Sequence, residues 1–172
     1  ERPQISTLGE FGLIKHLTEK FKITNPSTVK GVGDDAAVLH YPDKEVLVTT
    51  DLLLEGIHFD LVYTPLKHLG YKAAIVNFSD IYAMNGQPKQ ITVSLGISQR
   101  FSVEDLEQIY DGILTACQLY GGDLVGGDTS ASLTGLTISI TCIGEGAKGK
   151  NVYRNGAKAN DLICVSGDLG SA

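Results

Sequence analysis

The acidic residues of this chain gather in short turns, and their chemistry suits the binding of a hard cation. The four turns are GVGDDAAV at 31–38, VTTD at 48–51, VNFSD at 76–80 and VGGDTS at 125–130, which carry Asp34, Asp35, Asp51, Asp80 and Asp128. Aspartate beside glycine is also common in ordinary turns, where its carboxylate accepts hydrogen bonds from nearby backbone N–H groups. For any single turn this structural interpretation is at least as good as a metal site. Asp35 stays open between the two roles.

Asp80 is the acidic residue that a purely structural role explains least well. It falls in a helical pattern, on an otherwise apolar face that it shares with Val76, Asn77 and Met84. A buried carboxylate without a positive partner is costly unless it is paired, protonated or bound to a metal ion. The only basic residue nearby, Lys72, lies on a different face of the helix. A hard cation with oxygen ligands therefore fits this position.

The strand end at 49–51 offers further oxygen ligands for such a cation. Thr49 and Thr50 carry hydroxyl groups, and Asp51 carries a carboxylate. Because this set of residues contains no thiolate and almost no histidine, Mg²⁺ is preferred over zinc.

A second group of residues suits the binding of phosphate. The chain has no Walker A motif, no kinase-type glycine-rich loop and no dinucleotide fingerprint. Gly126, Gly127 and Asp128 would instead bring backbone N–H groups and a metal ligand to one phosphate. Arg154 is the obvious free positive charge, although a solvated loop arginine is an equally ordinary interpretation of it.

Composition excludes several classes of function. The chain has 172 residues and a net charge of -6, so it offers no basic stripe for nonspecific binding of nucleic acid. Cys117, Cys142 and Cys164 are widely spaced in apolar stretches, which indicates reduced core thiols rather than disulfides or a zinc site. No apolar run reaches membrane-spanning length and no basic leader is present, so a cytoplasmic location is expected.

Helical periodicity predicts the elements that carry part of this chemistry. Apolar residues at helical spacing predict helices at 10–21, 66–84 and 102–122. Ser102 is the expected N-cap of the third helix, which ends at a glycine pair. The second helix ends at NGQP, where Asn85 or Gly86 can adopt a left-handed cap and Pro88 prevents continuation.

Alternating apolar residues predict the strands. They lie at 29–39, 45–50, 91–97, near 124–125, 136–143 and 162–165, and GGDTSAS at 126–132 is predicted to be a turn. Helices alternate with strands, but some successive strands are joined by short turns. This mixture predicts an α+β domain with a mixed or antiparallel sheet and helices on one face.

Several of these stretches together resemble one protein family. They are GEF at 9–11, VGDDAAVL at 32–39, TTDLLLEGIHF at 49–59, GYKAAIVNFSDIYAMNGQP at 70–88, VGGDTS at 125–130 and RNGAKANDLICVSGDLGSA at 154–172. In this order and spacing they are similar to the amino-terminal half of thiamine-monophosphate kinase, and the similarity covers nearly the whole chain from Gly9 onward. Asn85 stands where family members usually carry glycine, a change that a left-handed cap tolerates.

The resemblance implies a fold, an assembly and a reaction. The fold is that of the amino-terminal domain of aminoimidazole ribonucleotide synthetase, two copies of which pair their sheets into a barrel across a homodimer. The reaction transfers phosphate from ATP to thiamine monophosphate, giving thiamine diphosphate, with several Mg²⁺ ions. Chains of the family continue into a second domain. Residues 1–172 are therefore expected to be one ATP- and Mg²⁺-binding amino-terminal domain, cut within the link that begins at about 150–172.

The resemblance also assigns roles to individual residues. It implies that Asp34, Thr49, Thr50, Asp51, Asp80 and Asp128 bind Mg²⁺, that Gly127, Asp128 and Arg154 bind nucleotide, and that His58 contacts the substrate. No catalytic base is assigned, because a phosphate monoester has a second pKa near 6 and is largely ionised at neutral pH. Without the resemblance, His58 is better explained as a partly buried structural histidine beside Phe59.

Two alternatives stay open. The first keeps the fold and changes the substrate, as in aminoimidazole ribonucleotide synthetase, selenophosphate synthetase or the hydrogenase maturation factor. The absence of a reactive Cys or Lys near the start disfavours the selenium enzyme. The second alternative is a noncatalytic dimerisation module in which the aspartates only form turns.

Overall fold

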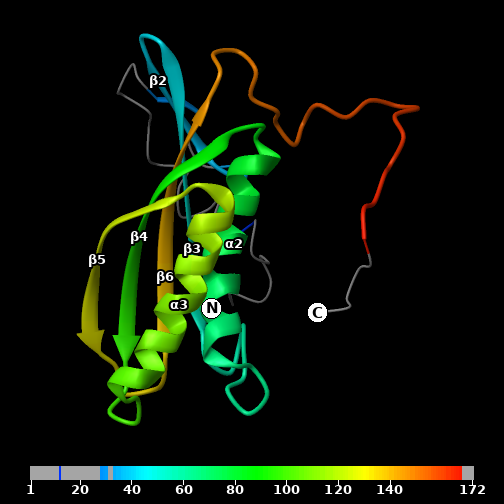
Figure 1. The fold of residues 1–172 in the computed structure, drawn as a ribbon. Coiled ribbons are helices and arrows are strands. Elements are labelled where there is room, and N and C mark those ends of the chain that lie inside the picture. Colours follow the sequence, from blue (N-terminus) through cyan, green and yellow to red (C-terminus); the bar gives the residue numbers. More distant parts are fainter. Residues whose placement is uncertain (1–11, 13–27, 31–32, 168–172) are drawn as a thin grey trace, which may run out of the picture.

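The fold is one curved sheet with two helices packed on the same side of it (Figure 1). The computed structural model describes residues 12, 28–30 and 33–167. The strands are β1 (Thr28–Lys30), β2 (Ala37–Tyr41), β3 (Lys44–Leu54), β4 (Gln87–Ile97), β5 (Asp123–Ala131) and β6 (Thr137–Gly146). They lie in the order β1-β2-β3-β6-β4-β5, and every neighbouring pair is antiparallel except β4 and β5. The predicted mixed sheet of an α+β domain is confirmed.

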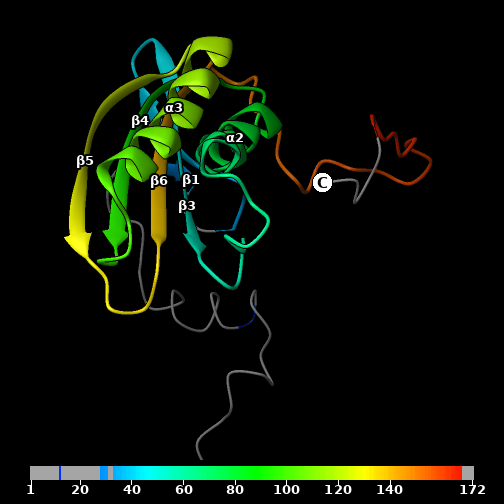
Figure 2. The same ribbon diagram turned by 60° about the horizontal axis from the view of Figure 1, so that its bottom comes forward.

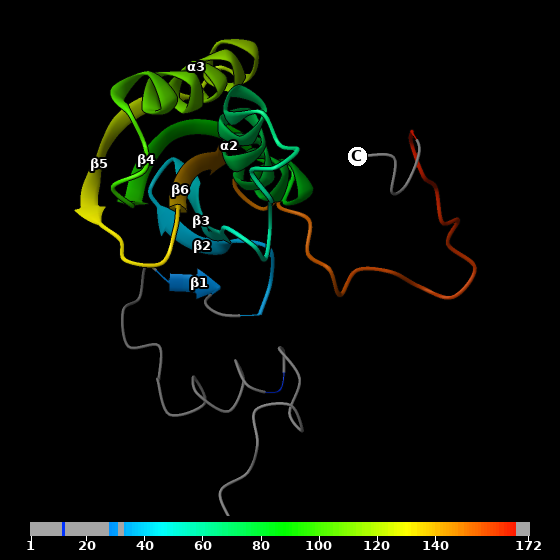
Figure 3. The ribbon, with the colours of Figure 1, turned by 90° about the horizontal axis from the view of Figure 1, so that it is seen from below.

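The two described helices, α2 (Leu66–Ala83) and α3 (Val103–Tyr120), cover one face of this sheet. Figures 2 and 3 show both helices on that side, with α3 over β4 and β5 and α2 towards β6 and β3. The predicted arrangement of helices on one face is confirmed. Neither helix is apolar enough over its length to cross a membrane.

Local sequence signals account for the ends of both helices. Ser102 and Asp105 form a capping box: the Asp105 N–H donates to Ser102 Oγ (3.2 Å), and the Ser102 N–H donates to the Asp105 carboxylate (2.9 Å). At the other end of α3, Gly121 takes a left-handed φ of 74°. After α2, Asn85 takes the left-handed position, with a φ of 60°. The predicted N-cap and both helix ends are confirmed.

The core lies between the helices and the sheet. Its largest fully buried side chains are Val38, Leu47, Leu69, Phe78, Ile81, Met84, Ile91, Ile109, Ile113, Leu136, Ile138 and Ile140. Along β6 buried residues alternate strictly with partly exposed ones, as expected for a strand with one covered face. The helix side of the sheet is therefore dry and closely packed, and polar groups on that side need specific partners.

Two sequence predictions of secondary structure were wrong. Residues 126–131 belong to β5, an exposed edge strand that pairs in parallel with β4, rather than to a turn. The glycines and small polar residues of this stretch hide its strand character, because an edge strand exposed along its whole length has no buried face to produce alternation. The run Leu162–Val165 forms no strand and its side chains are exposed. Apolar alternation gives a strand only where a neighbouring strand pairs with it, and the described chain offers none here.

The helix predicted at 10–21 falls outside the described residues, apart from Gly12, which is helical. The strand predicted at 29–39 is divided in the structure into β1 and β2. The bend at 33–36 between them carries Asp34 and Asp35.

Close contact of the two helices depends on Gly70 and Gly112. A Cβ atom at Gly112 would lie 1.9 Å from the carbonyl oxygen of Lys67, and one at Gly70 would lie 1.9 Å from that of Ile109. Real Cβ atoms do not approach backbone oxygen so closely, so any side chain at either position must push the helices apart.

Gly112→Ala is expected to destabilise the fold by about 1–3 kcal/mol, although alanine is the better helix former. Chemical denaturation measures the change, and Gln108→Ala at an exposed position of α3 is the matched control. A variant at Gly112 as stable as the control would contradict the close contact.

Candidate functional site

The candidate site forms where β2 ends and leaves the edge of β3 open. β2 pairs with β3 from Tyr41↔Lys44 to Ala37↔Val48 and no further. The next residues of β3 are Thr49, Thr50 and Asp51, while the bend before β2 brings Asp34 and Asp35 to the same level. Two acidic stretches that are distant in the sequence therefore meet at one edge of the sheet.

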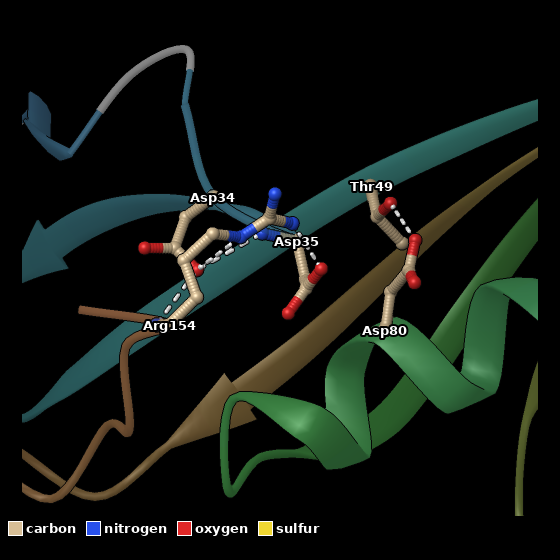
Figure 4. Close-up of polar contacts among 5 residues, drawn as sticks. All are labelled: Asp34, Asp35, Thr49, Asp80 and Arg154. Carbon is tan, nitrogen blue, oxygen red and sulfur yellow. Dashed lines mark hydrogen bonds and ion pairs between the residues drawn. The ribbon is translucent and has the colours of Figure 1, made fainter. Parts of the chain in front are cut away.

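Asp80 of α2 faces this edge. Its Oδ2 accepts a hydrogen bond of 2.7 Å from the hydroxyl of Thr49, which is itself buried (Figure 4). Burial raises the pKa of Asp80 above its usual value, and the nearby negative charges of Asp51 and Asp35 raise it further. Thr49 and Arg154 act in the opposite direction without reversing the shift. The predicted convergence of Thr49 and Asp80 is therefore present in the structure.

Asp51 has the same electrostatic character as Asp80. Burial raises its pKa, and the neighbouring His58 lowers it only in part. Two partly buried carboxylates thus lie near each other with their ionised forms disfavoured. A bound cation would remove this penalty at both positions at once.

Arg154 approaches the acidic edge from the carboxy-terminal segment. Its guanidinium forms ion pairs with Asp35 and, at 3.5 Å from Nε, with Asp34 (Figure 4). The backbone N–H of Arg154 also donates to Asp34, at 3.4 Å. The Asp34 side chain is only 2% exposed, whereas the Arg154 side chain is 44% exposed. One face of the arginine is thus held by carboxylates while the other remains open to solvent.

Contacts just before Arg154 bring this segment back to the domain. The N–H of Val152 donates to the carbonyl of Met84 (3.2 Å), and Asn151 Nδ2 donates to the buried Glu45 carboxylate (2.8 Å). Asn85 Nδ2 donates to the carbonyl of Lys150 (2.9 Å). The end of α2 and the start of β3 thereby direct residue 154 towards Asp34.

His58 lies in the loop that follows β3, and its imidazole is exposed. Its Nδ1 accepts a hydrogen bond of 2.9 Å from the Leu54 N–H, and its carbonyl accepts one of 2.9 Å from Lys72. Because Nδ1 acts as an acceptor, the proton of the neutral ring is assigned to Nε2. The buried Phe59 beside it anchors the loop. His58 therefore presents a hydrogen-bond donor to solvent, close to Asp51.

The structure does not bring Thr50, Gly127 and Asp128 to this edge. Thr50 points to the opposite face of the sheet, where its hydroxyl donates to the carbonyl of Ile140 (3.1 Å) and accepts from the Thr141 hydroxyl (3.1 Å). Gly127 and Asp128 lie on β5, which two other strands, β6 and β4, separate from β3. Asp128 accepts a hydrogen bond only from its neighbour Thr129, among the contacts of the described chain.

The residues predicted to bind metal, nucleotide or substrate line neither of two hollows on the surface of the described residues. The larger hollow, of about 580 Å³, lies between α3 and the start of β5 and is lined by Tyr110, Ile113, Leu114 and Leu124 among others. A second, of about 460 Å³, lies against α2 and α3 at Lys67 and Gly112. The carboxylate edge is a shallower, polar surface.

The donor groups at this edge fit Mg²⁺ in their chemistry. They are carboxylate and hydroxyl oxygens, which are the ligands that Mg²⁺ prefers, and burial disfavours the ionised forms of Asp51 and Asp80 until a cation binds. In the part of the chain that the structure describes, no three His, Cys, Asp or Glu side chains are already gathered as a metal cluster. Asp34 and Asp35 are paired with Arg154 instead.

Sequence reasoning overlooked two contacts of the site. The ion pair between Asp35 and Arg154 joins residues 119 positions apart, so no local pattern could reveal it. Lys72 lies on a different face of α2 from Asp80, as the sequence indicates, but that face directs its amine to the carbonyl of His58. His58 and Lys72 are separated by 14 positions, and no local pattern of the sequence indicates this contact.

Comparison with known proteins gives one consistent result. The family described as AIR synthase related protein, N-terminal domain, matches residues 33–145. The thiamine-monophosphate kinase of Bacillus subtilis is 39% identical over 168 residues, which cover 96% of this chain and 51% of that protein. The enzyme of the same name from Aquifex aeolicus is 40% identical over 169 residues, covering 98% of this chain and 52% of that protein.

A solved structure agrees with the sequence relatives. The structure described as "AaThiL complexed with AMPPCP and TMP" superposes with a TM-score of 0.79 at 36% identity, covering 91% of this chain and 48% of that one. The chain thus spans about half the length of the curated relatives it matches. Since the family match extends over more than half of the chain and the observed sheet and helices agree with it, the chain belongs to the AIR synthase related protein family, as its N-terminal domain.

Proposed function

We propose that this chain is the nucleotide- and Mg²⁺-binding half of a thiamine-monophosphate kinase, which transfers the terminal phosphate of ATP to thiamine monophosphate. The main support is the meeting of Asp34, Asp51, Asp80 and Arg154 at one edge of the sheet. The two relatives that are 39% and 40% identical to it carry that name, which favours this substrate over other substrates of the same fold.

The residues at the edge have distinct parts in the proposed reaction. Asp51, Asp80 and Thr49, with Asp34, would hold Mg²⁺, which supplies positive charge between the two phosphate groups and aligns them for in-line transfer. Asp128 and Gly127 of β5 and the hydroxyl of Thr50 remain proposed ligands of metal or nucleotide. No residue has to remove a proton, because the attacking phosphate is already largely ionised at neutral pH.

Arg154 and His58 would bind phosphate oxygens directly. The exposed side of the Arg154 guanidinium can donate charge-assisted hydrogen bonds to the nucleotide phosphates while its other side stays near Asp34. The Nε2–H of His58 is free to donate to the phosphate of thiamine monophosphate, because Nδ1 is already engaged by Leu54. Both groups reduce the repulsion between the two anions.

Calorimetric titration with AMPPCP in the presence and absence of Mg²⁺ tests the nucleotide part of this proposal. Binding that requires Mg²⁺ is the expected result. A folded protein that binds no nucleotide under either condition would favour the noncatalytic dimerisation module instead.

The remaining half of the site belongs to chain beyond residue 172 in this proposal. Residues 1–172 form the amino-terminal domain, and the segment from about 150 begins the link to a second domain. The exposed Leu162 and Ile163 in this segment agree with a partner surface that the described chain does not provide. Recognition of the thiamine rings is assigned to that second domain.

A homodimer through the sheet is also part of the proposal. Leu52 of β3 alternates with the buried Leu53, so its side chain projects from the face of the sheet turned away from α2 and α3, where it is 52% exposed. Pairing of two such faces would bury this side chain.

Leu52→Arg is expected to convert a dimer into a monomer, because it places a charge in an apolar interface. Light scattering at micromolar concentration measures the mass. Leu114→Arg, at a similarly exposed position on α3, is the control and should remain dimeric. A monomer mass for the unchanged protein would refute the dimer.

A further inference from the structure

Asn77 is a buried polar residue whose side-chain amide forms hydrogen bonds through both its nitrogen and its oxygen. It lies on α2, one helical turn before Asp80, and none of its surface is exposed. Its Nδ2 donates to the Ala73 carbonyl (3.0 Å), and its Oδ1 accepts from the backbone N–H of Asp51 (3.1 Å). These two hydrogen bonds fix the orientation of the amide, since a flipped amide would place a donor against a donor.

The N–H of Asp51 needs this partner because of the way the sheet ends. Pairing between β2 and β3 stops at Val48, three residues before Asp51. The Asp51 N–H points to Asn77, so without the amide oxygen it would be left without a hydrogen-bond partner in a partly buried place. Asn77 therefore takes the role that a neighbouring strand has elsewhere along β3.

A second hydrogen bond runs parallel to this one. Thr49 on β3 donates to Asp80 on α2, while Asp51 on β3 donates to Asn77 on α2. The two bonds join the same pair of elements, at residues two apart on the strand and three apart on the helix. They fix the distance and register between the strand that carries Asp51 and the helix that carries Asp80.

We propose that Asn77 is a positioning residue of the metal–nucleotide site, whose Oδ1 holds the backbone of Asp51 beside Asp80. This inference rests on the proposed function, because it assumes that Asp51 and Asp80 bind Mg²⁺. In this role Asn77 would contact neither metal nor nucleotide and would act through the backbone of Asp51. Residues that orient metal ligands in this way commonly affect metal affinity almost as strongly as the ligands themselves.

Two substitutions separate positioning from a contribution to folding. Asn77→Leu keeps the approximate size of the side chain but removes the acceptor for the Asp51 N–H. Asn77→Asp keeps an acceptor oxygen for the Asp51 N–H, but it replaces the amide donor that faces the Ala73 carbonyl with a second oxygen and adds a buried negative charge near Asp51 and Asp80. Without metal, Asn77→Asp is expected to be the less stable of the two because that charge lacks a positive partner. With Mg²⁺ present, the added charge attracts the ion.

Affinity and stability are therefore expected to follow opposite orders. Asn77→Leu should weaken Mg²⁺-dependent binding of AMPPCP by about 10- to 100-fold. Asn77→Asp should bind no more weakly than the unchanged protein. Phe78→Leu is the matched control, because it disturbs the neighbouring, equally buried position on α2 without contacting Asp51. It should lower the thermal midpoint and leave the affinity unchanged.

Calorimetric titration of the full-length protein and its three variants tests the inference, with Mg²⁺ and AMPPCP as ligands and circular dichroism to confirm folding at the titration temperature. A selective loss in Asn77→Leu supports the inference. Unchanged affinity in that variant overturns it, and so do affinities that follow the thermal midpoints across all three. If the unchanged protein binds no Mg²⁺–nucleotide, the proposed function itself fails, and this inference fails with it.

Discussion

Asp80→Asn and Asp51→Asn are each expected to weaken Mg²⁺-dependent nucleotide binding strongly and, in the absence of metal, to make the protein more stable. Loss of one carboxylate ligand should cost about 3 kcal/mol of binding free energy, or roughly 100-fold in affinity. The amide of asparagine preserves the shape of the side chain, and in Asp80→Asn the amide oxygen can still accept the hydrogen bond from Thr49. The loss therefore reports on charge rather than on packing.

The gain in stability follows from the raised pKa of both carboxyl groups. Burial raises each pKa in the folded protein above its unfolded value, so the folded state holds these protons more tightly than the unfolded state. The stability that this provides is present below the unfolded pKa and is lost as pH rises through the folded pKa. At pH values above the folded pKa the ionised carboxylates carry a cost, which asparagine removes. We expect the metal-free thermal midpoint to rise by about 1–3 °C.

Calorimetry for binding and thermal unfolding for stability measure the two effects in the same samples. Asp111→Asn, at an exposed acidic position on α3, is the control and should change neither. Unchanged nucleotide affinity in both site variants would count strongly against the metal site. A lower midpoint in metal-free buffer would contradict the electrostatic account of the edge.

Arg154→Gln is expected to have opposite effects on the two ligands. Affinity for Mg²⁺–AMPPCP should fall by at least about tenfold, because glutamine cannot provide charge-assisted hydrogen bonds to phosphate. Affinity for Mg²⁺ alone should rise, because the guanidinium that pairs with Asp34 and Asp35 competes with the metal for those carboxylates. Stability should change little, since the guanidinium is half exposed and the Asp34 carboxylate keeps the backbone N–H groups of Asp35 and Arg154 as donors.

The control for this variant is Lys158→Gln, which removes one positive charge from the same segment. Among the described residues, the hydrogen bond of Lys158 to Asp161 comes from its backbone N–H, and its side chain is given no part in the proposed site. If both variants shift Mg²⁺ affinity equally, the effect is one of net charge and the specific role of Arg154 is wrong. A fall in affinity for Mg²⁺ alone would also contradict the competition.

Local signals in the sequence were sufficient to predict much of the fold. The capping box at Ser102 and the left-handed Asn85 depend only on neighbouring residues, and both are found as predicted. The edge strand β5 was missed because its identity depends on pairing with β4 rather than on its own side chains. The strand predicted at 162–165 is absent although its own side chains favour it, because its apolar residues meet no partner strand in the described chain.

The site, like the fold, was predicted where it depends on local spacing and was missed where it depends on contacts between distant residues. Helical spacing placed Asp80 on the face of α2 that looks towards β3, and the end of that strand supplied Thr49. The pairing of Asp35 with Arg154 depends on how the chain returns past Met84 after β6, which no local pattern encodes. The separation of Asp128 from Asp51 likewise follows from strand order, because β6 is inserted between β3 and β4.

A product assay tests the proposed thiamine-monophosphate kinase activity most directly. The full-length protein and residues 1–172 alone are each incubated with Mg²⁺, ATP and thiamine monophosphate, and thiamine diphosphate is then separated by chromatography. We predict product from the full-length protein and none from the isolated domain, because the proposed function assigns the rest of the site to a second domain. No product from a folded full-length protein that binds Mg²⁺–nucleotide would contradict the kinase assignment and point to another phosphate acceptor or substrate on the same fold.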